Sequence, residues 1–242
     1  MSAPDRNPGF GRLYVVPSLL GVVPPAAVLP QGTIEIARSL SHFVVETPRI
    51  ARQFLKTLEM RRPLAELAMT ELNEHTPAGN VPGLLEPALR GFDLGLVTDA
   101  GCPGVADPGA SLVRAAHDAG VRVVALVGPS AILLALMASG MNGQNFAFRG
   151  YLPAKPAPRD AALRALDRAA DTGATQIFIE TPYRNDALIA AVLEVCRSTL
   201  RLCVAVDLTL PGEQVVSRTV GAWRSTPRSP IGKRPAIFLL GR

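Results

Sequence analysis

The chain has 242 residues, 48% of them hydrophobic and 19% charged, which excludes a disordered protein and allows one large or two modest domains. Its formal net charge of +5 favours anionic partners such as RNA or polycarboxylates. Three Cys, an odd number, argue against a disulfide framework and favour the reducing cytoplasm. Only eight Phe, three Tyr and one Trp argue against a surface built for stacking single-stranded bases.

Neither a secretory signal nor a membrane span is expected. The first ten residues, MSAPDRNPGF, contain no apolar core of the kind that signal peptides carry. The uncharged stretch from Val123 to Met141 approaches the length of a membrane span. Because Gly128-Pro129-Ser130 interrupts this stretch, we expect a strand followed by a helix instead.

Short apolar runs alternate with capped helices over most of the chain, which favours an α/β fold with mainly parallel pairing. Asp107 is the expected N-cap of one helix, with Pro108 as its first residue, and Ser130 is the expected N-cap of another. The predicted strands are 43–45, 94–98, 121–127 and 177–179, and the predicted helices begin at 47, 107, 130 and 181.

The last third of the chain has a different pattern. Residues 203–207, 214–220 and 236–240 are strand-like runs without long helices among them, so we expect a mixed sheet with antiparallel pairing. A predicted helix ends at Gly120, where a new strand begins. We therefore expect two α/β domains, an N-terminal one at 12–119 and a C-terminal one at 120–242.

The residues that most often carry chemistry are scattered. Common hydrolase, kinase and dinucleotide signatures (G-x-S-x-G, Walker A and G-x-G-x-x-G) are absent from the sequence. No metal site is expected, because the His and Cys residues lack the short spacings of zinc ligands. These residues are His42, His75, His117, Cys102, Cys196 and Cys203.

Glycine-rich loops follow the predicted strands, at the end of an α/β sheet where ligands bind. The loop DAGCPGVADPG begins at Asp99, which either accepts hydrogen bonds from a ligand or anchors the loop. The GPSA turn places Ser130 at a helix N-terminus, which suits an anionic group and equally suits a plain strand-to-helix turn. Glu46 and Glu180 each end a strand, where they either face a ligand or pair with a nearby Arg.

These motifs resemble the tetrapyrrole methylase superfamily, the class III S-adenosylmethionine-dependent methyltransferases. The similarity is greatest to the branch of ribosomal RNA small subunit methyltransferase I, whose blocks SDAGTP, SDPG, PGPSA, F-x-GFLP-x-K and YE-x-PHR occur in this order. Here they read TDAGCP, ADPG, VGPSA, FRGYLPAK and IETPYR, and the match extends from Leu13 almost to the C-terminus.

The chain departs from that branch at several polar positions, as a divergent paralogue does. The first loop, VPTPIGNL-x-D in the family, reads VPSLLGVVPP here and lacks the Asn and Asp. EDTR is replaced by ETPR, HNE by LNE and PHR by PYR. These changes raise the alternative of a catalytically silent, RNA-binding paralogue.

The resemblance implies two α/β domains with a cofactor cleft between them, usually in a cytoplasmic homodimer. S-adenosylmethionine is the implied cofactor, held mostly through backbone atoms. Cys102 occupies a position at which the branch has Thr, and we expect its thiol to pack against neighbouring residues rather than act as a nucleophile. By analogy, the cofactor-binding positions are Leu20, Ala100, Gly101, Cys102, Val105, Ser130, Ala131, Glu180, Leu208 and Ala236.

The same resemblance points to methyl transfer to ribosomal RNA ribose. Lys155 and Arg159 then contact phosphate, or else belong to a solvated basic loop. A tetrapyrrole or another small anionic acceptor is the alternative, because its carboxylates meet the same positive field. A hydroxyl acceptor also calls for a base. The candidates for that base, by position alone, are Glu46, Glu74 and Glu180.

Overall fold

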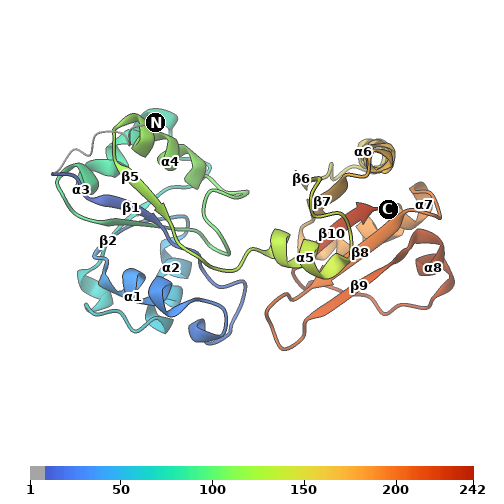
Figure 1. Ribbon diagram of the computed structural model, residues 1–242, viewed down its shortest axis with the longest axis horizontal. Coiled ribbons are helices and arrows are strands. Elements are labelled where there is room, and N and C mark those ends of the chain that lie inside the picture. The colour runs from blue at the N-terminus through green and yellow to red at the C-terminus, as the bar shows by residue number, and fades with distance from the viewer. Residues whose placement is uncertain (1–8) are drawn as a thin grey trace. The chain divides into compact units, whose positions relative to one another are not determined.

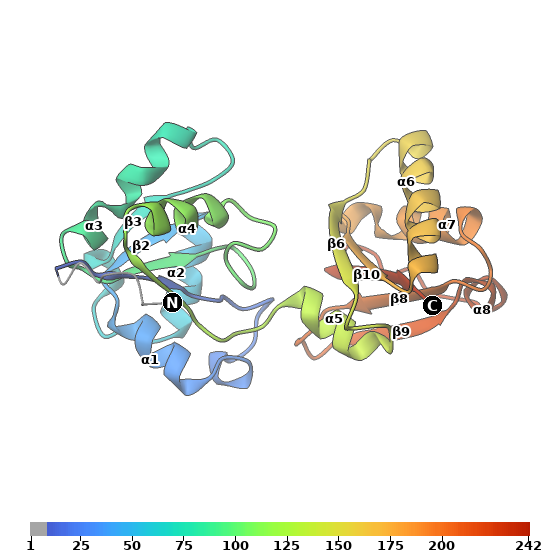
Figure 2. The same ribbon diagram turned by 45° about the horizontal axis from the view of Figure 1, so that its top comes forward.

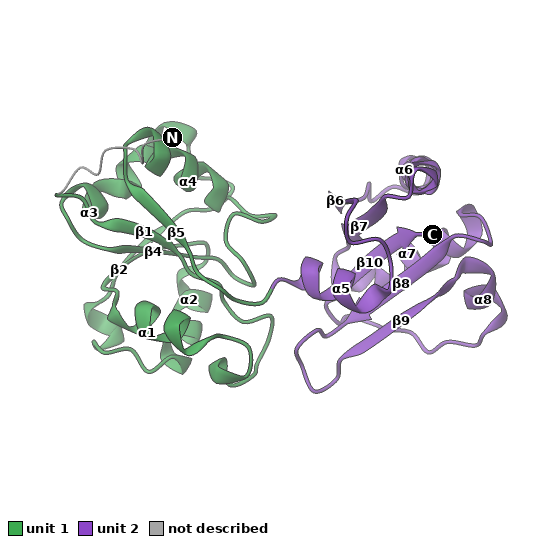
Figure 3. Ribbon diagram, in the orientation of Figure 1, with its two compact units in different colours: residues 1–129 green, residues 130–242 purple. Residues whose placement is uncertain are grey.

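The computed structural model describes residues 9–242, which divide after Pro129 into two compact units (Figure 3). The division lies ten residues beyond the expected one at 119/120, because the strand that follows Gly120 pairs with the first strand of the chain and therefore belongs to unit 1. The N-terminal segment in which the sequence shows no secretory signal lies mostly outside the described residues.

Unit 1 (up to Pro129) contains a five-stranded sheet in which every pairing is parallel, as expected. Its strand order is β3-β2-β4-β1-β5. The central strand β4 reads LGLV and is buried throughout, as is usual for parallel strands covered on both faces. The strands are β1 (Arg12–Val15), β2 (His42–Val45), β3 (Ala68–Glu71), β4 (Leu94–Val97) and β5 (Arg122–Ala125).

Helices cover both faces of this sheet (Figures 1 and 2). Helices α1 (Gln31–Ser39) and α2 (Pro48–Thr57) pack on one face in a core with Phe43, and α4 (Gly109–Asp118) packs on the other with Leu96. A short α3 (Glu86–Leu89) follows a 3-10 segment on the α4 side. The chain leaves β1 toward β2 and leaves β4 toward β5, so a topological switch point lies between β1 and β4.

Helix α4 begins one residue later than expected. Pro108 occupies the N-cap position without a side-chain cap, and Gly109 is the first helical residue. Asp107 still serves the helix start, because its Oδ1 accepts the amide of Gly109 at 2.7 Å. The carboxylate also accepts the amide of Gly104 at 2.9 Å, so it holds the glycine-rich loop as well as the helix.

Unit 2 (Ser130–Arg242) contains a mixed sheet, which confirms the expected change of pairing. Only β6 and β7 pair in parallel, whereas β10 and β9 run antiparallel to their neighbours. The strand order is β6-β7-β10-β8-β9. The strands are β6 (Phe146–Tyr151), β7 (Thr175–Ile179), β8 (Arg201–Val206), β9 (Gln214–Thr219) and β10 (Ala236–Gly241).

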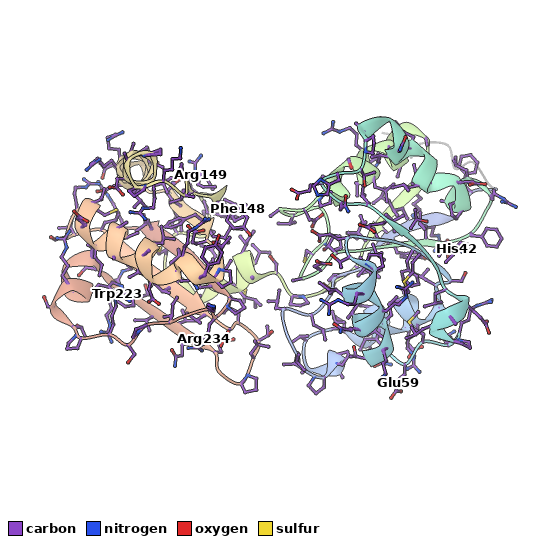
Figure 4. The ribbon with its side chains drawn as sticks, turned by 180° about the vertical axis from the view of Figure 1, so that it is seen from behind. His42, Glu59, Phe148, Arg149, Trp223 and Arg234 are labelled. Carbon is purple, nitrogen blue, oxygen red and sulfur yellow. The ribbon has the colours of Figure 1, made fainter. Side chains whose placement is uncertain are left out.

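The main core of unit 2 lies on one face of this sheet, under α6 (Pro156–Ala169), α7 (Asn185–Val195) and α8 (Val220–Ser225). Figure 4 shows this face toward the viewer, with Trp223 of α8 labelled. Strand residues that point the other way, such as Leu239, lie on the side of α5 (Ala131–Ser139), which packs against β10. The segment after Glu180 starts as a 3-10 turn, Pro182–Arg184, before α7.

The uncharged stretch 123–141 is a strand and a helix, as predicted: it comprises most of β5, a turn and α5. Ser130 caps α5 by accepting the Leu133 amide at 3.5 Å, and Gly140 ends the helix with a φ of 71°. Among the helices of residues 9–242, none combines the length and the apolar character needed to cross a membrane.

Candidate functional site

The loops that follow β1, β4 and β5 meet at the carboxyl end of the unit 1 sheet. The amide of Ser18, after β1, donates to the carbonyl of Gly101, after β4, at 2.9 Å. The thiol of Cys102 donates to the carbonyl of Pro129, after β5, at 3.4 Å. This is the switch-point edge at which open α/β sheets bind ligands.

Gly101 is a tightly confined residue of this edge. Its φ of +75° lies in the left-handed region that favours glycine. A Cβ placed there would lie 3.3 Å from Leu20 Cδ2 and 3.6 Å from the Pro129 carbonyl oxygen. Any larger side chain would therefore crowd Leu20 and the Pro129 carbonyl.

The rest of the glycine-rich loop is strained and open to solvent. Ala106 has a φ of 65°, which is uncommon for a residue with a Cβ, and such strain clusters at ligand sites. Ala100 and Val105 are exposed, and Val105 keeps 47% of its surface. Burial, reinforced by the charge of Asp107, raises the pKa of Cys102, which agrees with a packing role rather than a nucleophilic one.

Two carboxylates lie beside this loop, at the ends of β2 and β4. The amide of Asp99 donates to Glu46 Oε2 at 3.1 Å, and the hydroxyl of Thr47 donates to Asp99 Oδ2 at 2.8 Å. Burial raises the pKa of Glu46 above its ordinary value; the Asp99 amide opposes that shift, and the nearby carboxylates of Asp99 and Asp107 reinforce it. Asp99 therefore anchors the loop to β2, whereas Glu46 Oε1 accepts no hydrogen bond from residues 9–242.

Two hydroxyls at the same edge are buried without a partner. Ser18 and Thr98 follow β1 and β4 and are only 2% and 4% exposed. Within the described part of the chain, neither hydroxyl oxygen has a hydrogen-bond partner. A buried hydroxyl without a partner is costly, so these two groups mark a place where a polar ligand would be stabilised.

In unit 2, the sheet brings three predicted residues to one end. Ile179, the last residue of β7, pairs with Ile237, and Val206, the last residue of β8, pairs with Ala236. Glu180 and Leu208 lie just beyond those two strand ends. The antiparallel β10 therefore starts, at Ala236, between the ends of β7 and β8.

Glu180 is a structural anchor at this end. Its side chain is 2% exposed, and its Oε1 accepts hydrogen bonds from Arg184 at 2.6 and 3.0 Å and from the Thr181 amide at 2.6 Å. Burial alone would raise the pKa of Glu180, but the hydrogen bonds from Arg184 and Thr181 outweigh burial and hold the pKa below its ordinary value. Glu180 is therefore engaged with an Arg, the second of the two roles its position allowed.

Leu208 occupies a strained turn after β8. Its neighbours Asp207 and Thr209 have φ values of 50° and 72°. Arg234, labelled in Figure 4, fixes the turn by donating to Asp207 Oδ2 at 2.6 Å and to the Gly212 carbonyl. The Thr209 hydroxyl is a further buried group without a partner among the described residues.

The start of α5 points toward the same end of the sheet. A Cβ on Gly241, the last residue of β10, would meet Met141 Sδ at 3.0 Å, so the C-terminal end of α5 lies near the far end of β10. Because α5 packs along β10, Ser130 and Ala131 are directed toward the Ala236 end.

The ten predicted positions thus form two groups, five at each of two sheet ends. Sequence reasoning missed Ser18, Thr98, Asp207, Thr209 and Arg234. The motifs marked only the loops that contain Ser18 and Thr98, and no local pattern indicates that Arg234 pairs with Asp207. Of the other candidates, Glu74 is 85% exposed in its side chain, Lys155 is exposed, and Arg159 is mostly buried beside Asp160 at 3.3 Å.

Sequence comparisons place the chain among methylases. The profile of the family described as Tetrapyrrole (Corrin/Porphyrin) Methylases matches residues 34–223. Ribosomal RNA small subunit methyltransferase I of Xylella fastidiosa (strain Temecula1 / ATCC 700964) is 33% identical over 230 residues, covering 95% of this chain and 80% of that protein. The protein of the same name from Escherichia coli O157:H7 is 31% identical over 216 residues, covering 88% and 72%.

Solved structures show the same fold. The methyltransferase CobJ has a TM-score of 0.63 and 18% identity, covering 96% of this chain and 94% of that one. The cobalamin biosynthetic enzyme cobalt precorrin-4 methyltransferase, CbiF, has a TM-score of 0.61 and 15% identity, covering 100% and 98%. At such identities the likeness shows the fold alone.

Proposed function

Because the chain belongs to the tetrapyrrole methylase family and shares about a third of its residues with ribosomal RNA small subunit methyltransferase I, we propose that it transfers a methyl group from S-adenosylmethionine to ribosomal RNA ribose. The observation that carries the proposal is that this similarity, at 33% identity, covers 95% of the chain. The confined Gly101 loop at the switch point supports it. The proposed setting is the cytoplasm, and the proposed assembly is a homodimer.

The residues at the two sheet ends suit this cofactor. Its amino, carboxylate and hydroxyl groups are partners of the kind that the buried Ser18, Thr98 and Thr209 hydroxyls need. In unit 1 the proposed contacts are Leu20, Ala100, Gly101, Cys102 and Val105. In unit 2 they are Ser130, Ala131, Glu180, Leu208 and Ala236.

When bound, the cofactor supplies an activated methyl group on a sulfonium. The contribution of the chain is to orient the acceptor and exclude water, which accounts for roughly 7–11 kcal/mol of a barrier in favourable cases. A ribose hydroxyl must also lose its proton. Among the three glutamates considered, Glu180 is engaged with Arg184 and Glu74 is exposed, so we propose Glu46 as the base, through its unpaired Oε1.

Two measurements test this function. Calorimetric titration with S-adenosylhomocysteine is expected to show saturable binding, and no heat at a large excess of ligand would contradict cofactor competence. Mass spectrometry of ribosomal RNA from a deletion strain is expected to show one missing methyl group. An unchanged methylation map, with intact cofactor binding, would favour a tetrapyrrole or another small anionic acceptor. Unchanged RNA without cofactor binding would favour the silent RNA-binding paralogue.

A further inference from the structure

Two of the three tyrosines in this chain are exposed at one end of the unit 2 sheet. Tyr151 ends β6 and keeps 61% of its surface exposed, and Tyr183 follows β7 with 68% exposed. Tyr151 pairs with Ile179, the last residue of β7, so both tyrosines lie at the end of the sheet where these two parallel strands finish. Aromatic side chains exposed at an interaction site supply a large contact area, so two exposed tyrosines at the same sheet end suit the binding of a partner.

An arginine lies with these rings. The guanidinium carbon of Arg184 is 5.2 Å from the centroid of the Tyr183 ring, and its Nη1 donates to the Tyr183 hydroxyl at 3.3 Å. The pKa of Arg184 is raised, mainly by its hydrogen bonds to Glu180. Arg184 is thus held against the Tyr183 ring while it pairs with Glu180.

The buried side chain of Glu180 fixes the position of Arg184. Glu180, 2% exposed in its side chain, accepts two hydrogen bonds from Arg184, while the arginine itself remains 29% exposed. An arginine fixed in this way presents its planar group at the surface with little freedom left to lose. The tyrosine rings have few rotatable bonds, so the cluster as a whole is preorganised.

We propose that Tyr151, Tyr183 and Arg184 form a platform on which unpaired nucleobases of the RNA substrate stack. The inference rests on the proposed function and names the surface that recognises its acceptor. Single-stranded RNA is bound by stacking of its bases on aromatic rings and arginine planes beside positive charge. Lys155, exposed four residues after Tyr151, supplies such charge at the start of α6. The low aromatic content of the chain therefore does not exclude base stacking, because the few tyrosines are placed together.

The test measures the affinity of the full chain for a labelled, single-stranded oligoribonucleotide of mixed sequence by fluorescence anisotropy. Replacing either ring in Tyr151→Leu or Tyr183→Leu is expected to weaken binding by about tenfold, and the double variant by more. Tyr183→Phe keeps the ring and is expected to bind as the wild type does. Phe146→Leu removes an exposed aromatic at the opposite end of β6 and is the matched control, with no loss expected.

Wild-type affinity in the double variant, or no RNA binding by the wild type, would overturn the platform. Equal losses in Phe146→Leu would also overturn it, because the effect would then be that of any exposed ring. The outcome is separable from that of the proposed function. If the deletion strain lacks a methyl group and the double variant still binds RNA, the platform alone fails. If ribosomal RNA is unchanged and the Leu variants lose affinity, the proposed function alone fails.

Discussion

The two sheet ends at which the candidate site residues lie, one in each unit, are built in different ways. In unit 1 the strands are parallel, so the loops after β1, β4 and β5 meet at one edge, where Ser18 bonds to Gly101 through backbone groups and the Cys102 thiol bonds to the Pro129 carbonyl. In unit 2 the pairing is mixed, and the turns at the corresponding end are held by ion pairs, Glu180 with Arg184 and Asp207 with Arg234. Because Leu20 and the Pro129 carbonyl approach Gly101 closely, we expect the unit 1 end to be disturbed by added side-chain volume. We expect the unit 2 end to be disturbed by the loss of a charged partner.

The largest effect is expected from volume added in unit 1. Gly101→Val would fill the space beside Leu20, so binding of S-adenosylhomocysteine is expected to fall below detection in calorimetry. The positive φ at this position adds about 1–2 kcal/mol of strain. Gly120→Val carries a similar φ of 72° with nothing within 4 Å of its Cβ, so it is the matched control. Equal losses of binding in both variants would mean that strain, and not the occupied space, is responsible.

A smaller effect, on catalysis alone, is expected from Glu46→Gln. The Gln carbonyl still accepts the Asp99 amide, so the fold should persist while kcat falls on the order of a hundredfold. Because the pKa of Glu46 is raised, the wild-type rate should decrease with falling pH from above the ordinary glutamate value, as the carboxylate takes up a proton. The rate of the Glu46→Gln variant should not show this decrease at low pH. A pH profile that is the same in both proteins would remove Glu46 as the base.

Removing a charged side chain that fixes the turn after β8 in unit 2 should mainly lower the free energy of unfolding. Arg234→Leu leaves Asp207, 14% exposed, without its ion pair, and is expected to lower the free energy of unfolding by about 1–3 kcal/mol. Arg90→Leu breaks an exposed pair with Glu86 and should change it by only about 0–1 kcal/mol. Urea titration measures both values. Equal values for the two variants would show that the Asp207 pair does not hold the turn around Leu208.

The smallest effect is expected from volume added in unit 2. Ala236→Trp places a ring at the first residue of β10, and we expect S-adenosylhomocysteine to bind about tenfold more weakly, a change of 1.4 kcal/mol. The melting temperature should stay within a few degrees of the wild type. Ala190→Trp, on an exposed position of α7, is the control for the added ring. If Ala236→Trp leaves the dissociation constant unchanged, this strand does not contact the cofactor.

The sequence alone was sufficient for many of the elements and for the unit 1 loop, but it did not predict β1, β3, β6, α1 or α6. Alternating apolar runs and caps predict β4, β5, α5 and the change to mixed pairing, because periodicity and capping are local properties. The glycine-rich sequence predicted a ligand loop after β4, and in the structure Gly101 and Gly104 of that loop both have positive φ values. The family followed from the same short motifs.

Only the tertiary structure decided which side chains meet. The pairing of β5 with β1 placed the unit boundary at 129/130, since a strand belongs to the sheet that it completes, wherever a helix ends before it. The antiparallel β10 brought Arg234 to Asp207, 27 residues away, and pairing of β6 with β7 brought Tyr151 beside Ile179, at the strand end that precedes Tyr183. Contacts of this kind depend on strand order and register, which local sequence patterns do not encode.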